Sequence, residues 1–189
     1  IPGRLKMSIA ELDGERSGFD GGIDVRYPDE LAEDEVPGAS NLPVLSNEER
    51  AEVGTIYVQD DPFKARKIGA ALVAKNTAEH LQTALKDMPG GWRPMVYCWR
   101  GGQRSGSFAT ILKEIGWRVA VLDGGYKSYR RAVQHQLYEA EPAWRFIVLD
   151  GNTGTGKTEI LLKLEARGVQ ALDLEGLANH RGSLFGHRD

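Results

Sequence analysis

The sequence predicts an α/β protein with a mainly parallel sheet covered by helices on both faces, followed by the first strand–helix unit of a second domain. Three apolar segments support this prediction, because each runs into a glycine-rich turn and then into a helical pattern: residues 95–98, 118–123 and 146–150. Strands that alternate with helices along a chain form parallel sheets, and the helices cover both faces of such sheets.

The first half of the sheet domain is built from short segments. Residues 1–20 form an N-terminal extension, and residues 1–6, which precede Met7, fit a cloning-derived or a natural sequence equally. Residues 21–26 read as a short strand, and the turn-forming sequence 37–43 delivers another extended segment. Apolar side chains at helical spacing then predict one or two helices that end before residue 89: Ile68, Leu72, Leu81 and Leu85.

The second half gives clearer signals. A helix should follow residue 98 and end at Gly116, because four apolar side chains share one face: Phe108, Ile111, Leu112 and Ile115. Residues 118–123 form the next strand, Gly124-Gly125 a turn, and residues 126 to about 139 another helix. Glu141-Pro142 reads as a linker. We therefore expect one domain at residues 21–141 and the beginning of a second at 144–189.

Composition narrows the class of protein. The chain has 189 residues, a single cysteine and a formal charge of −3, so that a disulfide framework is excluded. We expect neither a membrane-spanning segment nor a signal peptide, and we expect a reducing cytoplasm. Net charge does not exclude a local basic patch. Lys127, Arg130 and Arg131 alternate with tyrosines and form a candidate RNA contact, with an ordinary solvated helix as the alternative.

The single cysteine, Cys98, stands where an apolar strand meets a glycine-rich loop and a helix. This arrangement directs backbone N–H groups, the positive end of a helix and two guanidinium groups toward one sulfur, which favours a reactive thiolate. The alternative is an inert buried cysteine. We predict Cys98 as the catalytic residue and assign the anion-binding loop to Trp99, Arg100, Gly101, Gly102, Gln103, Arg104 and Ser105.

A second phosphate-binding pattern follows the apolar segment 146–150. Residues 151–158 fit G-x-x-x-x-G-K-[ST], and residues 159–167 have a helix-forming composition that ends at Gly168. Strand, loop and helix are the context that this pattern requires. Lys157 supplies a mobile charge, and the Thr158 hydroxyl can reach Mg²⁺. The predicted phosphate-binding residues are Gly151, Asn152, Thr153, Gly154, Thr155, Gly156, Lys157 and Thr158.

Several segments together resemble a known family. Residues 24–26, 36–43, the Cys98 loop and residues 122–130 look like the successive signatures of a rhodanese domain. With residues 54–57, the P-loop and residues 173–182, the chain resembles the bacterial tRNA 2-selenouridine synthases, in which a rhodanese domain is fused to a P-loop domain. The resemblance extends from about Asp24 to the last residues.

The resemblance implies an activity. Family members replace the sulfur of 2-thiouridine at the tRNA wobble position with selenium from selenophosphate, through a geranylated intermediate. Cys98 would carry selenium as a selenyl-sulfide adduct, while Arg100 and Arg104 hold the anions. The P-loop would bind geranyl diphosphate, although ATP or GTP fits its pattern equally well. The implied partners are tRNA and a supply of selenophosphate.

Two departures from the family pattern keep alternatives open. Five residues separate Cys98 from Arg104, one more than in many single-domain rhodaneses, and this spacing is also that of tyrosine-type phosphatases. A Cys-dependent phosphatase or a thiosulfate sulfurtransferase with a regulatory P-loop is therefore the runner-up. A catalytically idle module that binds nucleotide and a partner is a third reading.

The second departure concerns the P-loop domain. Only residues 159–189 follow the P-loop, too few for a complete P-loop sheet. We therefore expect the chain to be part of a longer protein.

The remaining residues give weaker signals. Asp173 is a candidate Walker-B acid or, equally, a turn cap. Asp24 and Arg26 share a strand face and are expected to support the Cys98 loop rather than react. The four histidines have no metal-site spacing, and no metal ligand is predicted among them: His80, His135, His180 and His187.

Overall fold

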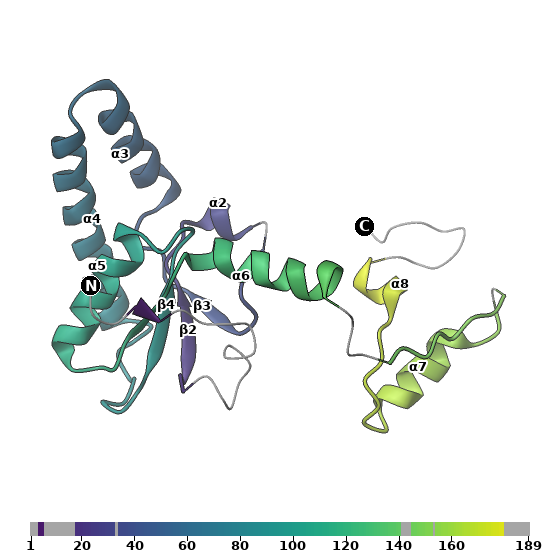
Figure 1. Cartoon of the computed structure of the whole chain (residues 1–189). Coiled ribbons are helices and arrows are strands. Elements are labelled where there is room, and N and C mark those ends of the chain that lie inside the picture. Colours follow the sequence, from purple (N-terminus) through teal and green to yellow (C-terminus); the bar gives the residue numbers. More distant parts are fainter. Residues whose placement is uncertain (1–3, 6–17, 33, 141–144, 153, 180–189) are drawn as a thin grey trace. The chain divides into compact units, whose positions relative to one another are not determined.

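The computed structural model describes residues 4–5, 18–32, 34–140, 145–152 and 154–179 (Figure 1). The chain divides into two compact units, Ile1–Pro142 and Ala143–Asp189.

Unit 1 is built on a parallel sheet. Within the described residues it has five strands in the order β1-β5-β4-β2-β3, and Val96 of β4 lies opposite Ile23 of β2 and Val121 of β5. The predicted α/β class with a parallel sheet is thus confirmed. One strand was not predicted: residues 4–5, placed in the N-terminal extension, pair with β5 as an edge strand. The strands are β1 Arg4–Leu5, β2 Gly21–Asp24, β3 Ala39–Asn41, β4 Pro94–Tyr97 and β5 Ala120–Leu122.

Helices cover both faces of this sheet, as the sequence predicted. Successive side chains of a strand point to opposite faces, and β4 shows the consequence. Val96 packs into a core with Phe108 and Leu112, whereas Tyr97 packs into a second core with Tyr126. The helices of unit 1 are α2 Pro28–Leu31, α3 Asn47–Gln59, α4 Pro62–Gln82, α5 Gln103–Ile115 and α6 Gly125–Gln134, the last continued by a π-helical turn, His135–Glu139.

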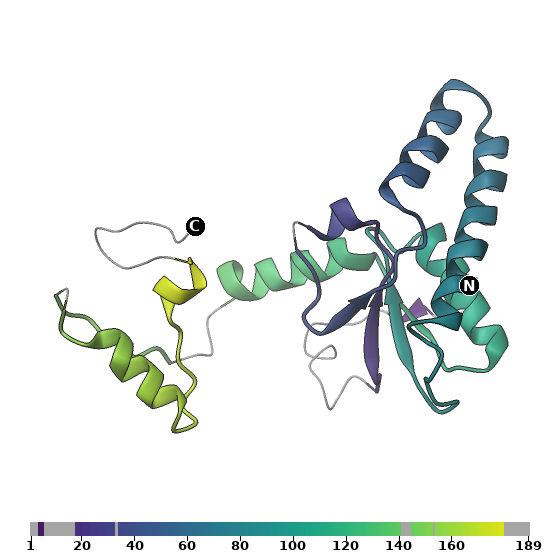
Figure 2. The same ribbon diagram turned by 180° about the vertical axis from the view of Figure 1, so that it is seen from behind.

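The helix α3 was missing from the sequence prediction. It pairs with α4 as a helical hairpin that projects from the sheet, as both ribbon views show (Figure 2). Its signal was local: the Ser46 hydroxyl accepts from the backbone of Glu49, and the Glu49 carboxylate accepts from the backbone of Ser46. Ser-x-x-Glu is the sequence pattern of this capping box.

The predicted helix ending at Gly116 is confirmed, with Gly116 in the left-handed conformation at φ 112°. Its apolar face is only partly as predicted. Phe108 and Leu112 are buried, but the side chain of Ile115 is 52% exposed. Ile115 is the last residue of α5, and the chain turns away at Gly116. Trp117, which follows the turn, fills the core at this point.

Unit 2 corrects one predicted element. Residues 146–150 form no strand, and Ile147 and Val148 are 96% and 84% exposed. A strand is held by hydrogen bonds to a neighbouring strand, and the described residues 145–152 and 154–179 provide none. The helices α7 Lys157–Glu165 and α8 Leu174–Leu177 do form.

None of the helices in the described residues is long and apolar enough to cross a membrane.

Candidate active site

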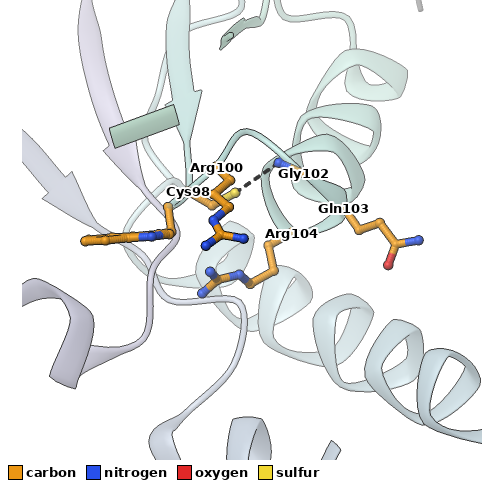
Figure 3. Close-up of a pocket in the computed structure, with 6 residues that line it drawn as sticks. Cys98, Arg100, Gly102, Gln103 and Arg104 are labelled. Carbon is orange, nitrogen blue, oxygen red and sulfur yellow. Dashed lines mark hydrogen bonds between the residues drawn. The ribbon is translucent and has the colours of Figure 1, made fainter. Parts of the chain in front are cut away.

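Cys98 lies directly after β4, at the carboxyl edge of the parallel sheet. The loop behind it leads to α5, whose first turn faces the sulfur (Figure 3). The Gly102 N–H donates to Cys98 Sγ at 3.4 Å, and the Ser105 hydroxyl lies 3.2 Å from the same sulfur. The cysteine is only 2% exposed, so that these contacts act in a site largely shielded from water.

Opposing effects set the pKa of Cys98. Burial, the largest single effect, raises it, because an apolar environment disfavours the thiolate. Hydrogen bonds from the Ser105 hydroxyl and from the backbone N–H groups of Ser105 and Gly102, with the positive charge of Arg104, act in the other direction and outweigh burial. The pKa of Cys98 therefore lies below that of an ordinary cysteine, which favours the nucleophilic thiolate.

A pocket of about 340 Å³ opens above the sulfur. The predicted loop residues divide into two groups. Gly101 and Ser105 are buried and do not line the pocket. The others line it together with the cysteine: Cys98, Trp99, Arg100, Gly102, Gln103 and Arg104.

The two arginines of the pocket differ in their surroundings. Figure 3 places both guanidinium groups beside Cys98, whereas Gln103 points away from it. Arg100 is exposed. Arg104 donates through both terminal nitrogens to the two carboxylate oxygens of Glu30, at 2.5 and 3.1 Å. The ring of Tyr27 lies 5.5 Å from the same guanidinium.

Sequence reasoning missed Glu30. It belongs to α2, far from the cysteine loop in the sequence, and only the fold brings it to Arg104. An acidic residue in the first turn of a short helix is common, so that nothing in the local sequence identifies this ion pair.

Asp24 and Arg26, which are predicted to support the Cys98 loop, form a buried ion pair. Both side chains are fully buried, and the Arg26 guanidinium donates to the Asp24 carboxylate at 2.7 Å and to the carbonyls of Glu30 and Asp34. The guanidinium carbon also lies 5.8 Å from the ring of Trp99. Arg26 thus connects β2 with α2 and with the wall of the pocket.

A glycine turn fixes the cysteine loop from the other side. Gly125 has φ +61°, and a Cβ atom there would lie 2.1 Å from the Cys98 carbonyl oxygen. The Tyr126 N–H donates to that oxygen at 2.9 Å, and the Lys127 N–H donates to the Trp99 carbonyl at 3.1 Å. The start of α6 therefore holds the loop through its backbone, in a space that only glycine fits.

The candidate RNA contacts Lys127, Arg130 and Arg131 are all exposed on α6. The neighbouring tyrosines are not: Tyr126 is buried, and Tyr129 is half-buried. One face of α6 thus packs on the sheet, and the other presents the cations to solvent.

The described residues of the P-loop pattern lead directly into α7. Gly154 and Gly156 have left-handed backbones, and the Lys157 ammonium donates to the carbonyls of Gly151 and Asn152. Thr155 and Thr158 are exposed, and Thr153 lies outside the described residues. Asp173 directly precedes α8 and makes no side-chain cap.

The described histidines have other contacts. His80 lies 2.9 Å from the Pro43 carbonyl, and His135 faces Glu139. His180 and His187 are outside the described residues. In the described part of the chain, no group of three or more metal-ligating side chains comes together.

Comparison with known proteins agrees with this geometry. The model of the rhodanese-like domain matches residues 10–132. The chain belongs to the rhodanese-like domain family. A second model, described as the tRNA 2-selenouridine synthase AAA domain, matches residues 144–189.

Similar proteins extend this result over 87% of the chain. The tRNA 2-selenouridine synthases of Sulfurovum sp. and Bdellovibrio bacteriovorus are 44% and 41% identical to it over 87% of its length. The resemblance inferred from the motifs is confirmed. The chain spans 44% and 43% of these relatives' own lengths.

A solved structure supports the fold of unit 1. The N-terminal domain of a Clostridium difficile 630 protein described as ATP/GTP binding is 38% identical. It has a TM-score of 0.52 and covers 59% of this chain and 87% of its own.

Proposed function

We propose that this chain is the chalcogen-carrying part of a tRNA-modifying selenotransferase, which replaces the sulfur of 2-thiouridine with selenium. The observation that supports this most directly is the environment of Cys98. Its sulfur accepts hydrogen bonds at a helix N-terminus, its pKa is lowered, and two arginines stand beside it. A thiolate beside an anion-binding loop suits attack on an anionic chalcogen donor.

The loading step can be written for selenophosphate. The Cys98 thiolate attacks selenium, an S–Se bond forms, and the Se–P bond breaks with its electron pair leaving on phosphorus as phosphite. Arg100 and Arg104 stabilise the donor and the leaving anion. With thiosulfate the same step gives a persulfide and sulfite.

The P-loop serves the activation of the base in this proposal. The sulfur of 2-thiouridine attacks the first carbon of geranyl diphosphate, the carbon–oxygen bond breaks, and diphosphate leaves. Backbone amides of residues 151–156 and the Lys157 ammonium would hold that diphosphate. The exposed hydroxyl of Thr158 could contribute a ligand to Mg²⁺, which would neutralise the leaving group.

Transfer to the base completes the sequence. The perselenide selenium on Cys98 attacks the base carbon that bears the geranylthio group, and geranylthiolate leaves. An external thiol then attacks Cys98 sulfur, and the S–Se bond breaks with its electron pair staying on the base selenium. Cys98 is left as a mixed disulfide, which a second external thiol reduces to the thiolate. Because the chain has one cysteine, the thiols that release the product must come from outside it.

The loading step is tested by intact mass and product analysis. Selenophosphate should add one selenium to the protein with stoichiometric phosphite, and Cys98→Ser should abolish the gain while the circular dichroism spectrum is unchanged. Ser107→Ala serves as the control. It changes an exposed serine on α5, the helix that follows the cysteine loop, and should load normally. Phosphate without a protein adduct would contradict the carrier role.

A Cys-dependent phosphatase is the second candidate, because the spacing from Cys98 to Arg104 fits it equally. The same mass measurement separates the two functions. A phosphatase would form a phosphocysteine and gain no chalcogen. In the structure both oxygens of the acid beside the loop, Glu30, accept hydrogen bonds from Arg104. That acid is therefore occupied as an ion-pair partner.

A further inference from the structure

The Cys98 pocket is larger than its proposed anion requires. Its volume of about 340 Å³ falls within the range of pockets that hold small organic ligands, ~300–1,000 Å³. A five-atom anion such as selenophosphate displaces roughly the volume of three water molecules, ~90 Å³. Most of the pocket is thus available to a second ligand group.

One wall of the pocket is aromatic. Trp99 is half-buried, and its ring packs on Tyr126 at a centroid distance of 5.6 Å with an interplanar angle of 33°. Tyr126 in turn packs on Tyr129 at 6.0 Å and on the buried guanidinium of Arg26 at 4.0 Å. These contacts hold the indole in place. A fixed, partly exposed indole next to a cavity is a stacking surface for a flat ring.

The helix that begins beside this wall carries positive charge outward. The Lys127 N–H donates to the Trp99 carbonyl at 3.1 Å, so that this lysine is tied to the pocket rim. Lys127 and Arg130 are exposed and three residues apart, which places them on the same side of α6. An aromatic surface flanked by cations is how proteins bind single-stranded nucleic acid.

We propose that Trp99 stacks on the nucleobase that reacts at Cys98, and that Lys127 and Arg130 bind phosphates of the same RNA strand. This assignment rests on the proposed function, because the base is taken to be a thiolated pyrimidine of tRNA. The base must leave its own stack to reach a sulfur that is 2% exposed, and Trp99 replaces the stacking partner that it loses.

Binding of a fluorescent RNA stem-loop with 2-thiouridine in its loop tests the proposal on the full chain. Trp99→Leu should weaken binding by about fivefold or more, the loss expected for one base–aromatic contact. Trp99→Phe keeps an aromatic ring against Tyr126 and should bind with intermediate affinity. Phe63→Leu, which removes a 67% exposed aromatic ring from the distant α4, should have no effect.

The salt dependence of RNA binding tests the two cations separately. Lys127→Ala and Arg130→Ala should each reduce the slope of log affinity against log salt by about 0.7, as for one phosphate contact on a single strand. Arg118→Ala removes an exposed cation that precedes β5. It lies at the amino-terminal ends of the parallel strands, whereas Cys98 lies at their carboxyl ends, and the change should leave the slope unchanged.

Near-ultraviolet crosslinking of the thiobase, followed by peptide mass mapping, gives an independent readout. The crosslink should fall between Trp99 and Arg104 in the wild type and be lost in Trp99→Leu. If Cys98 takes up no selenium, the proposed function fails, whatever the RNA results. If Cys98 loads normally while Trp99→Leu binds RNA and crosslinks like the wild type, the stacking assignment alone is overturned.

Discussion

Arg104 of the cysteine loop and Glu30 of α2 form a two-pronged ion pair, with nitrogen–oxygen distances of 2.5 and 3.1 Å. The side chains are 25% and 14% exposed, so that water screens the pair only partly. The same Arg104 lowers the pKa of Cys98 through its charge. Glu30 therefore offsets part of the positive charge that Arg104 presents to the thiolate and to an incoming anion.

Substitution Glu30→Gln should lower the pKa of Cys98 further. The amide keeps a hydrogen-bond acceptor for Arg104 but removes the opposing charge, so that the thiolate becomes more stable. At a pH below the pKa, alkylation by iodoacetamide should be about threefold to tenfold faster than in the wild type.

Ser105→Ala should shift the pKa of Cys98 in the opposite direction. It removes a hydrogen bond to Cys98 Sγ, so that the pKa should rise and alkylation should begin at higher pH. An alkylation profile for Glu30→Gln that coincides with the wild-type profile would show that Glu30 only supports the fold.

Gly125→Ala should disrupt the cysteine loop. The new Cβ atom would approach the Cys98 carbonyl oxygen to 2.1 Å at a backbone φ of +61°, and both the clash and the left-handed backbone are unfavourable. We expect a loss of about 2 kcal/mol or more in the free energy of unfolding, measured by urea denaturation.

Gly116→Ala is the matched control for this change. Its φ is also positive, at +112°, but a Cβ atom there meets nothing within 4 Å. It should lose only the backbone contribution, about 1 kcal/mol. Equal losses in the two variants would mean that the close approach at Gly125 is unimportant.

Lys157→Ala should separate the two proposed sites. It removes the cation of the P-loop without touching the cysteine loop, so that geranyl diphosphate affinity in calorimetry should fall about tenfold or more. Selenium loading of Cys98 should survive. Lys163→Ala removes an exposed cation from the same helix, paired with Glu159, and should leave both unchanged. Joint loss of binding and loading in Lys157→Ala would show that the sites are not independent.

Hydrogen exchange should distinguish the two units. Unit 1 has its own sheet and core, so that amides around Val96 and Leu112 should be strongly protected. The described residues of the segment 146–174 form no strand, and Ile147 is 96% exposed, so that amides outside α7 should exchange fast. Uniform strong protection of residues 146–174 in a monomer of this chain would contradict the domain division.

Elements whose causes are local could be predicted from the sequence. The alternation of apolar strands with helices indicated the parallel α/β sheet, and Gly116 ended α5 as predicted, because only glycine adopts its backbone easily. The anion loop was visible because Cys98, its glycines and Arg104 are close neighbours in the chain.

The remaining features could not be predicted from the sequence, because they depend on partners that are distant in the chain. Glu30 reaches Arg104 only through the fold, and burial and hydrogen bonding together set the pKa of Cys98. Residues 146–150 carry a strand-like pattern yet form no strand and stay exposed, since a pattern alone supplies no neighbouring strand to pair with. The sequence of a segment limits the secondary structures and contacts that it can form. The residues that the fold brings next to it determine which of these it forms.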